Sequence, residues 1–182
     1  MFTLIWIIFN FMIMNIAFVS NFQKTYLFSF IADGLMAKGY SIYWICFSKT
    51  YYDYLCTKYA QEDILLLNRE MAKMHNAPIG EYKLNELVYN DRALSYEREW
   101  GLRFLQNIQE PFLNFINKKT VRYVFGEMTY AHEILMNRIC RDKLNGICDY
   151  LHPQSIRIPN GRFSFMDTEF QNSLHPSCIG VN

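Results

Sequence analysis

The residues best suited to chemistry lie in VFGEMTYAHEILMNRICR, residues 124–141. Glu127 comes directly after a short apolar run, and His132 follows at the start of a helical pattern. A carboxylate at this position could accept a hydrogen bond from a substrate hydroxyl or act as a general base, with the imidazole in support. The alternative is structural, because the helix dipole stabilises a carboxylate near a helix N-terminus without any catalytic task. The sequence leaves both interpretations open.

The segment SNFQKT, residues 20–25, is the next candidate for ligand contact. It follows a short β-rich run, and Asn21 or Lys24 could reach a ligand there, close to the N–H groups of a following helix. The segment lacks the glycines of a GxGxxG or P-loop fingerprint, so neither a dinucleotide nor a Walker-type site is indicated. A solvated loop is the structural alternative for Lys24.

Cationic side chains surround a turn signal near the end of the sequence. In RIPNGRF, residues 157–163, Arg157 and Arg162 lie on either side of Asn160 and the glycine that follows it. Guanidinium groups in this arrangement could bind phosphate or carboxylate groups, so these three residues are predicted to contact substrate. An Asn-Gly pair is equally typical of an ordinary hairpin turn.

Metal and cofactor chemistry are not indicated. Cys140, Cys148, His152 and His175 are too irregularly spaced for a zinc site. The absence of a glycine-rich phosphate loop gives no reason to expect a nucleotide cofactor. The five cysteines are odd in number and lack paired CxxC spacing, which is typical of a reducing cytoplasm rather than a disulfide framework.

Strand-like runs alternate with longer helical runs from Met14 onward, which predicts a parallel α/β architecture. Predicted strands cover residues 16–20, 41–48, 64–68, 121–125 and 155–159. Predicted helices cover residues 26–39, 50–60, 100–116 and 128–143. Residues 69–94 are rich in turn formers and predict a long connection that could carry a short strand. Pro111 is predicted to kink or split the helix around it.

This order of elements gives Glu127 a predicted position. If 121–125 is a parallel strand followed by a helix, Glu127 lies at the carboxyl edge of the sheet, where open α/β folds bind ligands. The loop at 20–25 is expected at the same edge. On the following helix, Glu133, Asn137 and Arg141 are predicted to form a polar face.

The composition indicates a folded protein with an ample core. Of 182 residues, 51% are hydrophobic and 17% are aromatic, which excludes a disordered chain. The formal net charge of +1 gives no broad electrostatic reason to expect nucleic acid or an anionic membrane as partner. We predict one α/β domain at 14–170, since the length fits about one domain, with an apolar extension at 1–13 and an irregular tail at 171–182.

The first residues complicate the assignment of a compartment. No charged residue occurs before Lys24, yet the apolar run reaches the roughly 20 residues of a membrane span only by including Asn10 and Asn15. It also lacks the basic start and the small-residue end of a signal peptide. We therefore predict a cytoplasmic protein, and we leave open a peripheral attachment to the inner face of the cytoplasmic membrane through residues 1–13.

A family resemblance enters at the same residues. The runs FGEMTYAHEILMNRICR and YLHPQSIRIPNGRFSF resemble bacterial proteins of capsular and other surface polysaccharide biosynthesis, some of which are glycosyltransferase-like. The run MNIAFVSNFQKTYLFSFIADGLMAKGYSIYWI resembles the first βαβ unit of a two-domain glycosyltransferase of the GT-B type. Together these stretches cover most of residues 14–170.

The resemblance implies a Rossmann-like N-terminal half that receives an oligosaccharide or glycolipid acceptor. The nucleotide-sugar donor would be held chiefly by a second half that this sequence lacks, so a truncated fragment unable to turn over alone is expected. On this basis Glu127 would orient or deprotonate the acceptor, His132 would support it, and Arg157 or Arg162 would bind anionic groups. A non-catalytic binding protein and a membrane-associated accessory component of polysaccharide assembly or export are the alternatives.

Overall fold

The structure is a computed structural model that describes residues 14–74, 82–154 and 164–175. Its strands are β1 Asn15–Ser20, β2 Ser41–Cys46, β3 Ile64–Leu66, β4 Tyr123–Phe125, β5 Asp149–Gln154 and β6 Ser164–Met166. Its α-helices are α1 Lys24–Met36, α2 Lys49–Cys56, α3 Leu84–Asn90, α4 Arg98–Lys118 and α5 Ala131–Lys143. Short 3₁₀ turns cover Gln61–Asp63, Arg69–Lys73 and Leu94–Tyr96.

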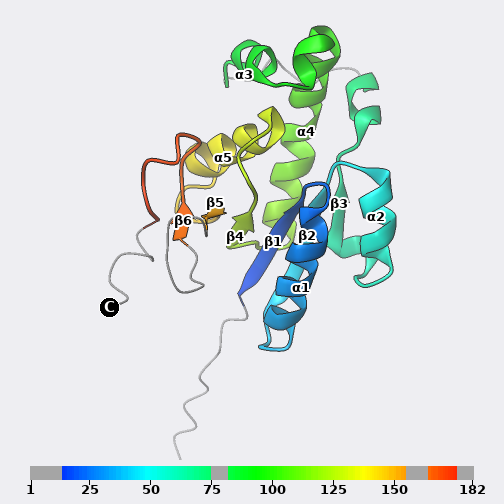
Figure 1. Ribbon diagram of the computed structural model, residues 1–182, viewed down its shortest axis with the longest axis vertical. Coiled ribbons are helices and arrows are strands. Elements are labelled where there is room, and N and C mark those ends of the chain that lie inside the picture. The colour runs from blue at the N-terminus through cyan, green and yellow to red at the C-terminus, as the bar shows by residue number, and fades with distance from the viewer. Residues whose placement is uncertain (1–13, 75–81, 155–163, 176–182) are drawn as a thin grey trace, which may run out of the picture.

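One six-stranded sheet lies at the centre, in the order β3-β2-β1-β4-β5-β6 (Figure 1). Neighbouring strands from β3 to β5 are parallel, and β6 runs antiparallel to β5. The predicted open, mainly parallel, Rossmann-like α/β fold is therefore confirmed.

Helices cover both faces of this sheet. Phe18 of β1 belongs to a buried cluster that includes Phe28 of α1 and Leu55 of α2. Its neighbour Val19 belongs to a second cluster that includes Phe112 of α4 and Leu135 of α5. Because successive side chains of a strand point to opposite faces, α1 and α2 cover one face while α4 and α5 cover the other.

Pro111 was predicted to kink or split its helix; α4 continues through Pro111, so a split does not occur, and a kink stays a prediction. Proline removes one intrahelical hydrogen bond and costs a helix interior roughly 3 kcal/mol. The buried row on the sheet side of α4 consists of Gly101, Phe104, Leu105, Ile108, Phe112, Phe115 and Ile116. Each large apolar side chain buried there contributes about 1.5–3 kcal/mol, which is enough in sum to keep the helix intact.

Helix α3 and strands β5 and β6 were not predicted from the sequence. Helix α3 forms inside the stretch predicted as a connection, and Leu84, Leu87 and Val88 are its buried residues. Strand β5 has the sequence DYLHPQ, in which Asp and Pro are residues that strands disfavour. The strand predicted at 155–159 lies outside the described residues.

The order of strands reverses between β1 and β4. Strand β1 pairs with β2 on one side and with β4 on the other. The chain moves outward from β1 to β3 and returns to β4, so the segments after β1 and β4 diverge toward opposite faces and leave space between them. Any ligand site of the usual α/β type is expected at this edge.

Gly126 permits a close contact directly after β4. An ideal Cβ built on Gly126 would lie 1.9 Å from the Tyr150 hydroxyl oxygen and 2.7 Å from its Cζ. Tyr150 is 2% exposed, so its ring cannot move away without disturbing the core. Gly34 in α1 offers a contrast, because a Cβ there would meet nothing within 4 Å.

We expect Gly126→Ala to lower the free energy of unfolding by about 1–3 kcal/mol, the usual cost of overpacking a core. Gly34→Ala, the matched control, should raise it by about 0.5–1 kcal/mol because alanine is the better helix former. Urea denaturation of both variants checks this. Equal stabilities would contradict the close packing of Gly126 on Tyr150.

Candidate functional site

Three predicted site residues, Asn21, Lys24 and Glu127, meet beyond the carboxyl ends of β1 and β4. The side-chain amide of Asn21 donates a hydrogen bond of 2.8 Å to Oε2 of Glu127. The Lys24 ammonium forms an ion pair with Oε1 of the same carboxylate. Glu127 therefore lies at the carboxyl edge of the sheet, beside the segment that follows β1, as its predicted position required.

These contacts also define what Glu127 does in the structure. Both carboxylate oxygens have nitrogen partners from the segment after β1, and the Glu127 side chain is only 15% exposed. The carboxylate thus joins the segments after β1 and β4, which is the structural alternative noted for it. Its catalytic role stays a prediction.

Glu133 is buried rather than part of a polar face. It is 0% exposed, and its two oxygens accept hydrogen bonds from the backbone N–H groups of Glu127, Thr129 and Tyr130 at 3.1, 3.1 and 3.2 Å. Helix α5 begins at Ala131, so Glu133 reaches back over N–H groups that have no partner within the helix. The segment from 127 to 130 is held by this one carboxylate.

Of the other two residues of the predicted polar face, Asn137 is buried and Arg141 is exposed. Asn137 is 2% exposed, and its amide donates to the backbone oxygens of Tyr150 and Asp167 at 3.3 and 2.9 Å. Arg141 is exposed and lies beside Asp142. The predicted polar face was therefore wrong for Glu133 and Asn137, because both satisfy backbone groups of neighbouring segments.

Asp91 is a second buried carboxylate that reaches the start of α5. Its Oδ2 accepts a hydrogen bond of 2.7 Å from the N–H of Ala131. Its Oδ1 accepts from the N–H groups of Ala93 and Leu94 at 2.7 and 2.9 Å. Asp91 thereby fastens the segment between α3 and α4 to the first residue of α5.

A cavity of about 620 Å³ opens above the carboxyl ends of β1, β2 and β3, and we call it the crevice. Its floor includes Asn21, Ser48 and Asn68, which each follow one of these strands. Its ring-bearing lining consists of Phe22, Phe47, Tyr51, Trp100, Phe104, Tyr130 and His132. The volume is within the range of about 300–1,000 Å³ usual for small-molecule sites.

His132 is enclosed by aromatic rings of the crevice. Its ring centroid lies 4.0 Å from that of Phe47 and 5.6 Å from that of Tyr130, with which it is stacked. Burial lowers the pKa of His132 below its ordinary value, although the negative charges of Glu133 and Asp91 act in the opposite direction. The imidazole is consequently neutral at pH 7, where it can either donate or accept a hydrogen bond.

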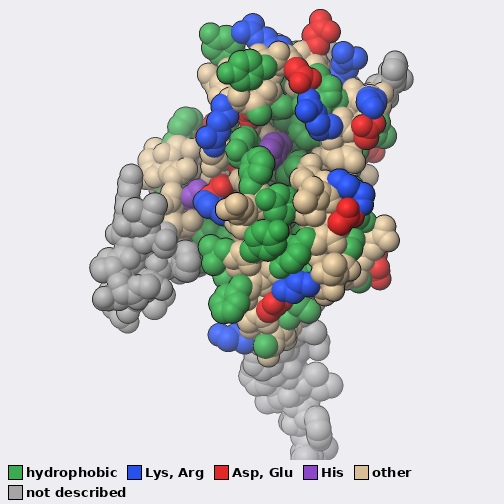
Figure 2. All heavy atoms as spheres, turned by 45° about the vertical axis from the view of Figure 1, so that its right-hand side comes forward, with side chains coloured by type: hydrophobic (Ala, Val, Ile, Leu, Met, Phe, Trp, Pro, Cys, Tyr) green, Lys and Arg blue, Asp and Glu red, His purple; other side chains and the backbone are tan. Residues whose placement is uncertain are grey.

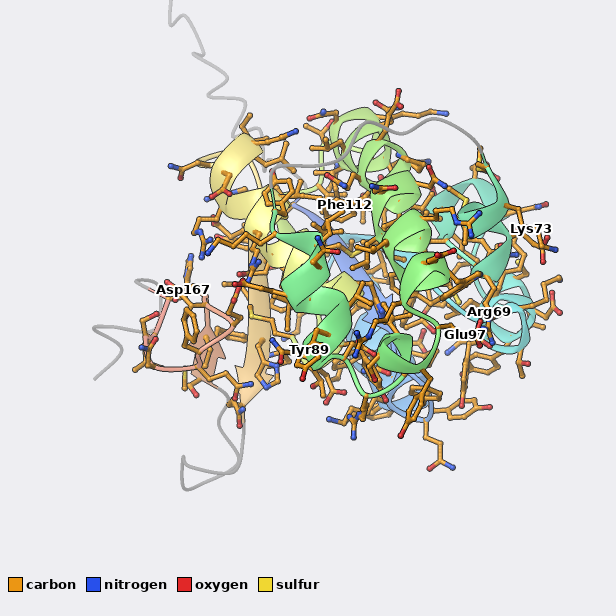
Figure 3. The ribbon with its side chains drawn as sticks, turned by 90° about the horizontal axis from the view of Figure 1, so that it is seen from above. Arg69, Lys73, Tyr89, Glu97, Phe112 and Asp167 are labelled. Carbon is orange, nitrogen blue, oxygen red and sulfur yellow. The ribbon has the colours of Figure 1, made fainter. Side chains whose placement is uncertain are left out.

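Charged groups form the rim of the crevice. Arg69 donates from one guanidinium nitrogen to both oxygens of Glu97 at 3.0 and 3.1 Å, and Figure 3 shows the two residues meeting from separate segments. The Arg69 guanidinium also lies 4.6 Å from the centre of the Trp100 ring. Arg92 lies 4.9 Å from the centre of the Tyr130 ring. The rim thus combines cations with flat ring surfaces.

The structure does not bring all predicted site residues into one cavity. Asn21 and His132 line the crevice, whereas Lys24 and Glu127 line a separate groove on the α1 face of the sheet. Arg157, Asn160 and Arg162 lie outside the described residues.

Two negative findings apply to the described ranges 14–74, 82–154 and 164–175. Within them, no group of three or more His, Cys, Asp or Glu side chains is arranged to hold a metal ion. No helix there combines the length and apolar character needed to cross a membrane.

Sequence reasoning missed most of the crevice lining. Trp100 and Phe104 were predicted only as core residues of a helix, and Phe47 only as the end of a strand. Asp91 had a signal in YNDRAL, since Asp often accepts from backbone N–H groups two or three residues later. Its hydrogen bond to residue 131 spans 40 residues, and nothing local indicates it.

Comparison with known proteins gives no further assignment. No protein-family model matches the sequence, and neither a curated protein nor a solved structure matches it significantly. The fold and the geometry of the crevice are therefore the basis for any functional inference.

We expect Glu133→Gln to lower the free energy of unfolding by about 2 kcal/mol or more, because the variant amide turns a donor toward backbone N–H groups and removes charge-assisted hydrogen bonds. Glu99→Gln is the matched control: Glu99 also lies in the first turn of a helix, but its side chain is 92% exposed. That control should change stability by less than about 0.5 kcal/mol. Denaturant titration of both variants is the measurement, and similar effects would contradict the anchoring role of Glu133.

The lowered pKa of His132 predicts a loss of stability in mild acid. The unfolded chain, with a histidine pKa near 6.5, takes up the proton before the folded chain does. Stability therefore falls as pH drops from about 6.5 toward the lower folded-state pKa of His132. His152, whose pKa burial also lowers, contributes in the same direction.

To isolate His132, we would compare unfolding free energies at about pH 7.5 and pH 5.5 for the parent and for His132→Gln. The parent should lose more stability than the variant over this interval, since His152 is present in both. Parallel losses would show that His132 is not held neutral by burial.

Proposed function

We propose that the chain is the acceptor-side domain of a glycosyltransferase-like protein of capsular or surface polysaccharide biosynthesis, and that its crevice binds the acceptor glycan. The observation that carries the proposal is the aromatic lining of a cavity at the carboxyl edge of a Rossmann-like sheet. Flat ring faces suit the apolar C–H faces of a sugar, and the polar groups between them suit its hydroxyls. The resemblance described above supports the same class of ligand.

The polar groups of the crevice are of the kinds that recognise hydroxyls. Asn21 and Asn68 line it with side-chain amides, and Ser48 adds a hydroxyl. A neutral His132 offers both a donor and an acceptor, one on each ring nitrogen. Inside the charged rim, the described chain therefore presents hydroxyl-binding polar groups between aromatic walls.

The start of α5 is poorly suited to a nucleotide diphosphate. A helix N-terminus after a parallel strand is a ready anion site, but here Asp91 and Glu133 already accept hydrogen bonds from its N–H groups. Two carboxylates would repel a diphosphate. This arrangement favours an acceptor site over a donor site and is consistent with donor binding by a second half.

A second candidate function is glycan binding without catalysis by this chain. It is favoured by the contacts of Glu127, whose two oxygens are engaged by Asn21 and Lys24 and which lines the groove instead of the crevice. In this version the protein would keep the fold and the ligand site, and Glu127 would only hold two segments together.

Binding of defined oligosaccharide acceptors by the full chain, measured by calorimetry or ligand-observed NMR, tests the proposal. We expect Trp100→Leu to weaken saccharide binding about tenfold, which corresponds to about 1.4 kcal/mol of lost ring contact. Tyr96→Leu is the control, because Tyr96 is 87% exposed and does not line the crevice. Equal effects of the two substitutions, or binding of nucleotide sugars but not of saccharides, would contradict the proposal.

Glu127→Gln separates the two versions. If Glu127 orients the acceptor, the loss of its carboxylate charge lowers the affinity for the saccharide. If it only joins the two segments, affinity is retained and thermal stability decreases slightly, as expected for loss of an ion pair whose lysine is 55% exposed.

A further inference from the structure

The α1 face of the sheet is only half covered by helices in the described chain. Helices α1 and α2 pack over β1, β2 and β3, while α4 and α5 lie on the opposite face. Over β4 and β5 a groove of about 550 Å³ remains on the α1 face. Its apolar walls include Leu27, Ile31 and Leu35 of α1 and Phe125, Leu151 and Phe165 of the strands.

Such a groove is unusual in a mainly parallel sheet. Parallel sheets are normally covered on both faces, because their strands are apolar on both sides. Figure 2 shows hydrophobic side chains gathered on the surface around α1. Leu27 is 52% exposed, although it occupies the first turns of a helix that packs on the sheet. The groove therefore leaves apolar surface that a covering segment would bury.

The neighbouring chain supplies a segment of matching chemistry. Met14, the first residue that the structure describes, lines the groove, and residues 1–13 are joined to it. Among residues 1–13, only Thr3 and Asn10 carry polar side chains, and none is charged. The groove is charged only through Lys24 and Glu127, which pair with each other, and its other polar side-chain groups are the hydroxyls of Tyr40 and Tyr123. A segment without charged side chains that directly precedes Met14 can cover the groove without leaving a buried charge unpaired.

We propose that residues 1–13 of the chain cover this groove, packing on the exposed side of α1 and on β4 and β5. The reach is sufficient, because thirteen residues span about 20 Å as a helix and up to about 43 Å when extended. That compares with about 20 Å for α1, which also has 13 residues. The segment buries its own apolar side chains by the same contact, which is favourable at about 25 cal/mol per Å². This inference does not depend on the proposed function.

Trp6 makes the proposal measurable in the full chain. The sequence contains three tryptophans, at positions 6, 44 and 100. Subtracting the emission of Trp6→Phe from that of the parent isolates the signal of Trp6. We expect this signal to be blue-shifted and several-fold less accessible to acrylamide than free N-acetyltryptophanamide, at any protein concentration and without lipid.

Substitutions in α1 locate the contact. Leu27→Gln, in the groove, should shift the Trp6 emission toward the red and raise its quenching. Phe30→Gln is the matched control, since Phe30 is 77% exposed on the same helix and does not line the groove. Leu27→Ala provides a milder variant, and circular dichroism verifies that each variant is folded.

Four results would overturn the proposal. Trp6 quenched as fast as the free fluorophore would show that residues 1–13 do not cover the groove. Protection that increases with protein concentration would assign the groove to a second copy of the chain. Protection that occurs only with vesicles of phosphatidylcholine and phosphatidylglycerol would assign residues 1–13 to a membrane surface. An equal response to Leu27→Gln and Phe30→Gln would likewise exclude the groove as the binding surface.

Discussion

The arrangement of the crevice depends on one buried carboxylate. Glu133 receives three backbone N–H groups from the segment that joins β4 to α5. This segment includes Met128 with a φ of 54°, a conformation that residues other than glycine adopt rarely. A buried charge with no partner would be costly, so the carboxylate and the segment stabilise each other. This contact fixes the backbone between Glu127 and α5, the helix that carries His132.

The two carboxylates at the start of α5 also decide which chemistry the site can support. Asp91 and Glu133 place negative charge where many α/β folds bind phosphate. The helix dipole stabilises them there, but the same interaction is then no longer available to an anionic ligand. Inside its charged rim, the crevice is bounded by aromatic rings, amides and a neutral imidazole. Its character follows from internal hydrogen bonds rather than from the net charge of the chain.

The sequence was sufficient to predict β1 to β4 and helices α1, α2, α4 and α5, but not α3, β5, β6 or the details of the site. Alternating apolar runs predict parallel α/β structure because each run must bury one or both faces. By contrast, β5 contains Asp149 and Pro153, and its strand form depends on pairing with β4 and β6. The burial of Glu133 was equally hidden. A glutamate in the first turn of a helix can either extend into solvent or accept hydrogen bonds from the preceding loop. Only the tertiary path of residues 127–130 decides between these two arrangements.

Glu127 belongs to the wall between the crevice and the groove. Asn21 lines the crevice and donates to Glu127, which lines the groove together with Lys24. A ligand in the crevice that accepts the hydrogen bond of the Asn21 amide would therefore leave Oε2 of Glu127 without this donor. The Glu127 carboxylate would keep Lys24 as its counter-ion. It would lose only the hydrogen bond from the Asn21 amide, which costs about 1–3 kcal/mol because the acceptor is charged. If residues 1–13 cover the groove, they exclude water from Oε2 of Glu127, and the loss of the Asn21 hydrogen bond then costs more. Ligand binding in the crevice and coverage of the groove would therefore oppose each other through Glu127.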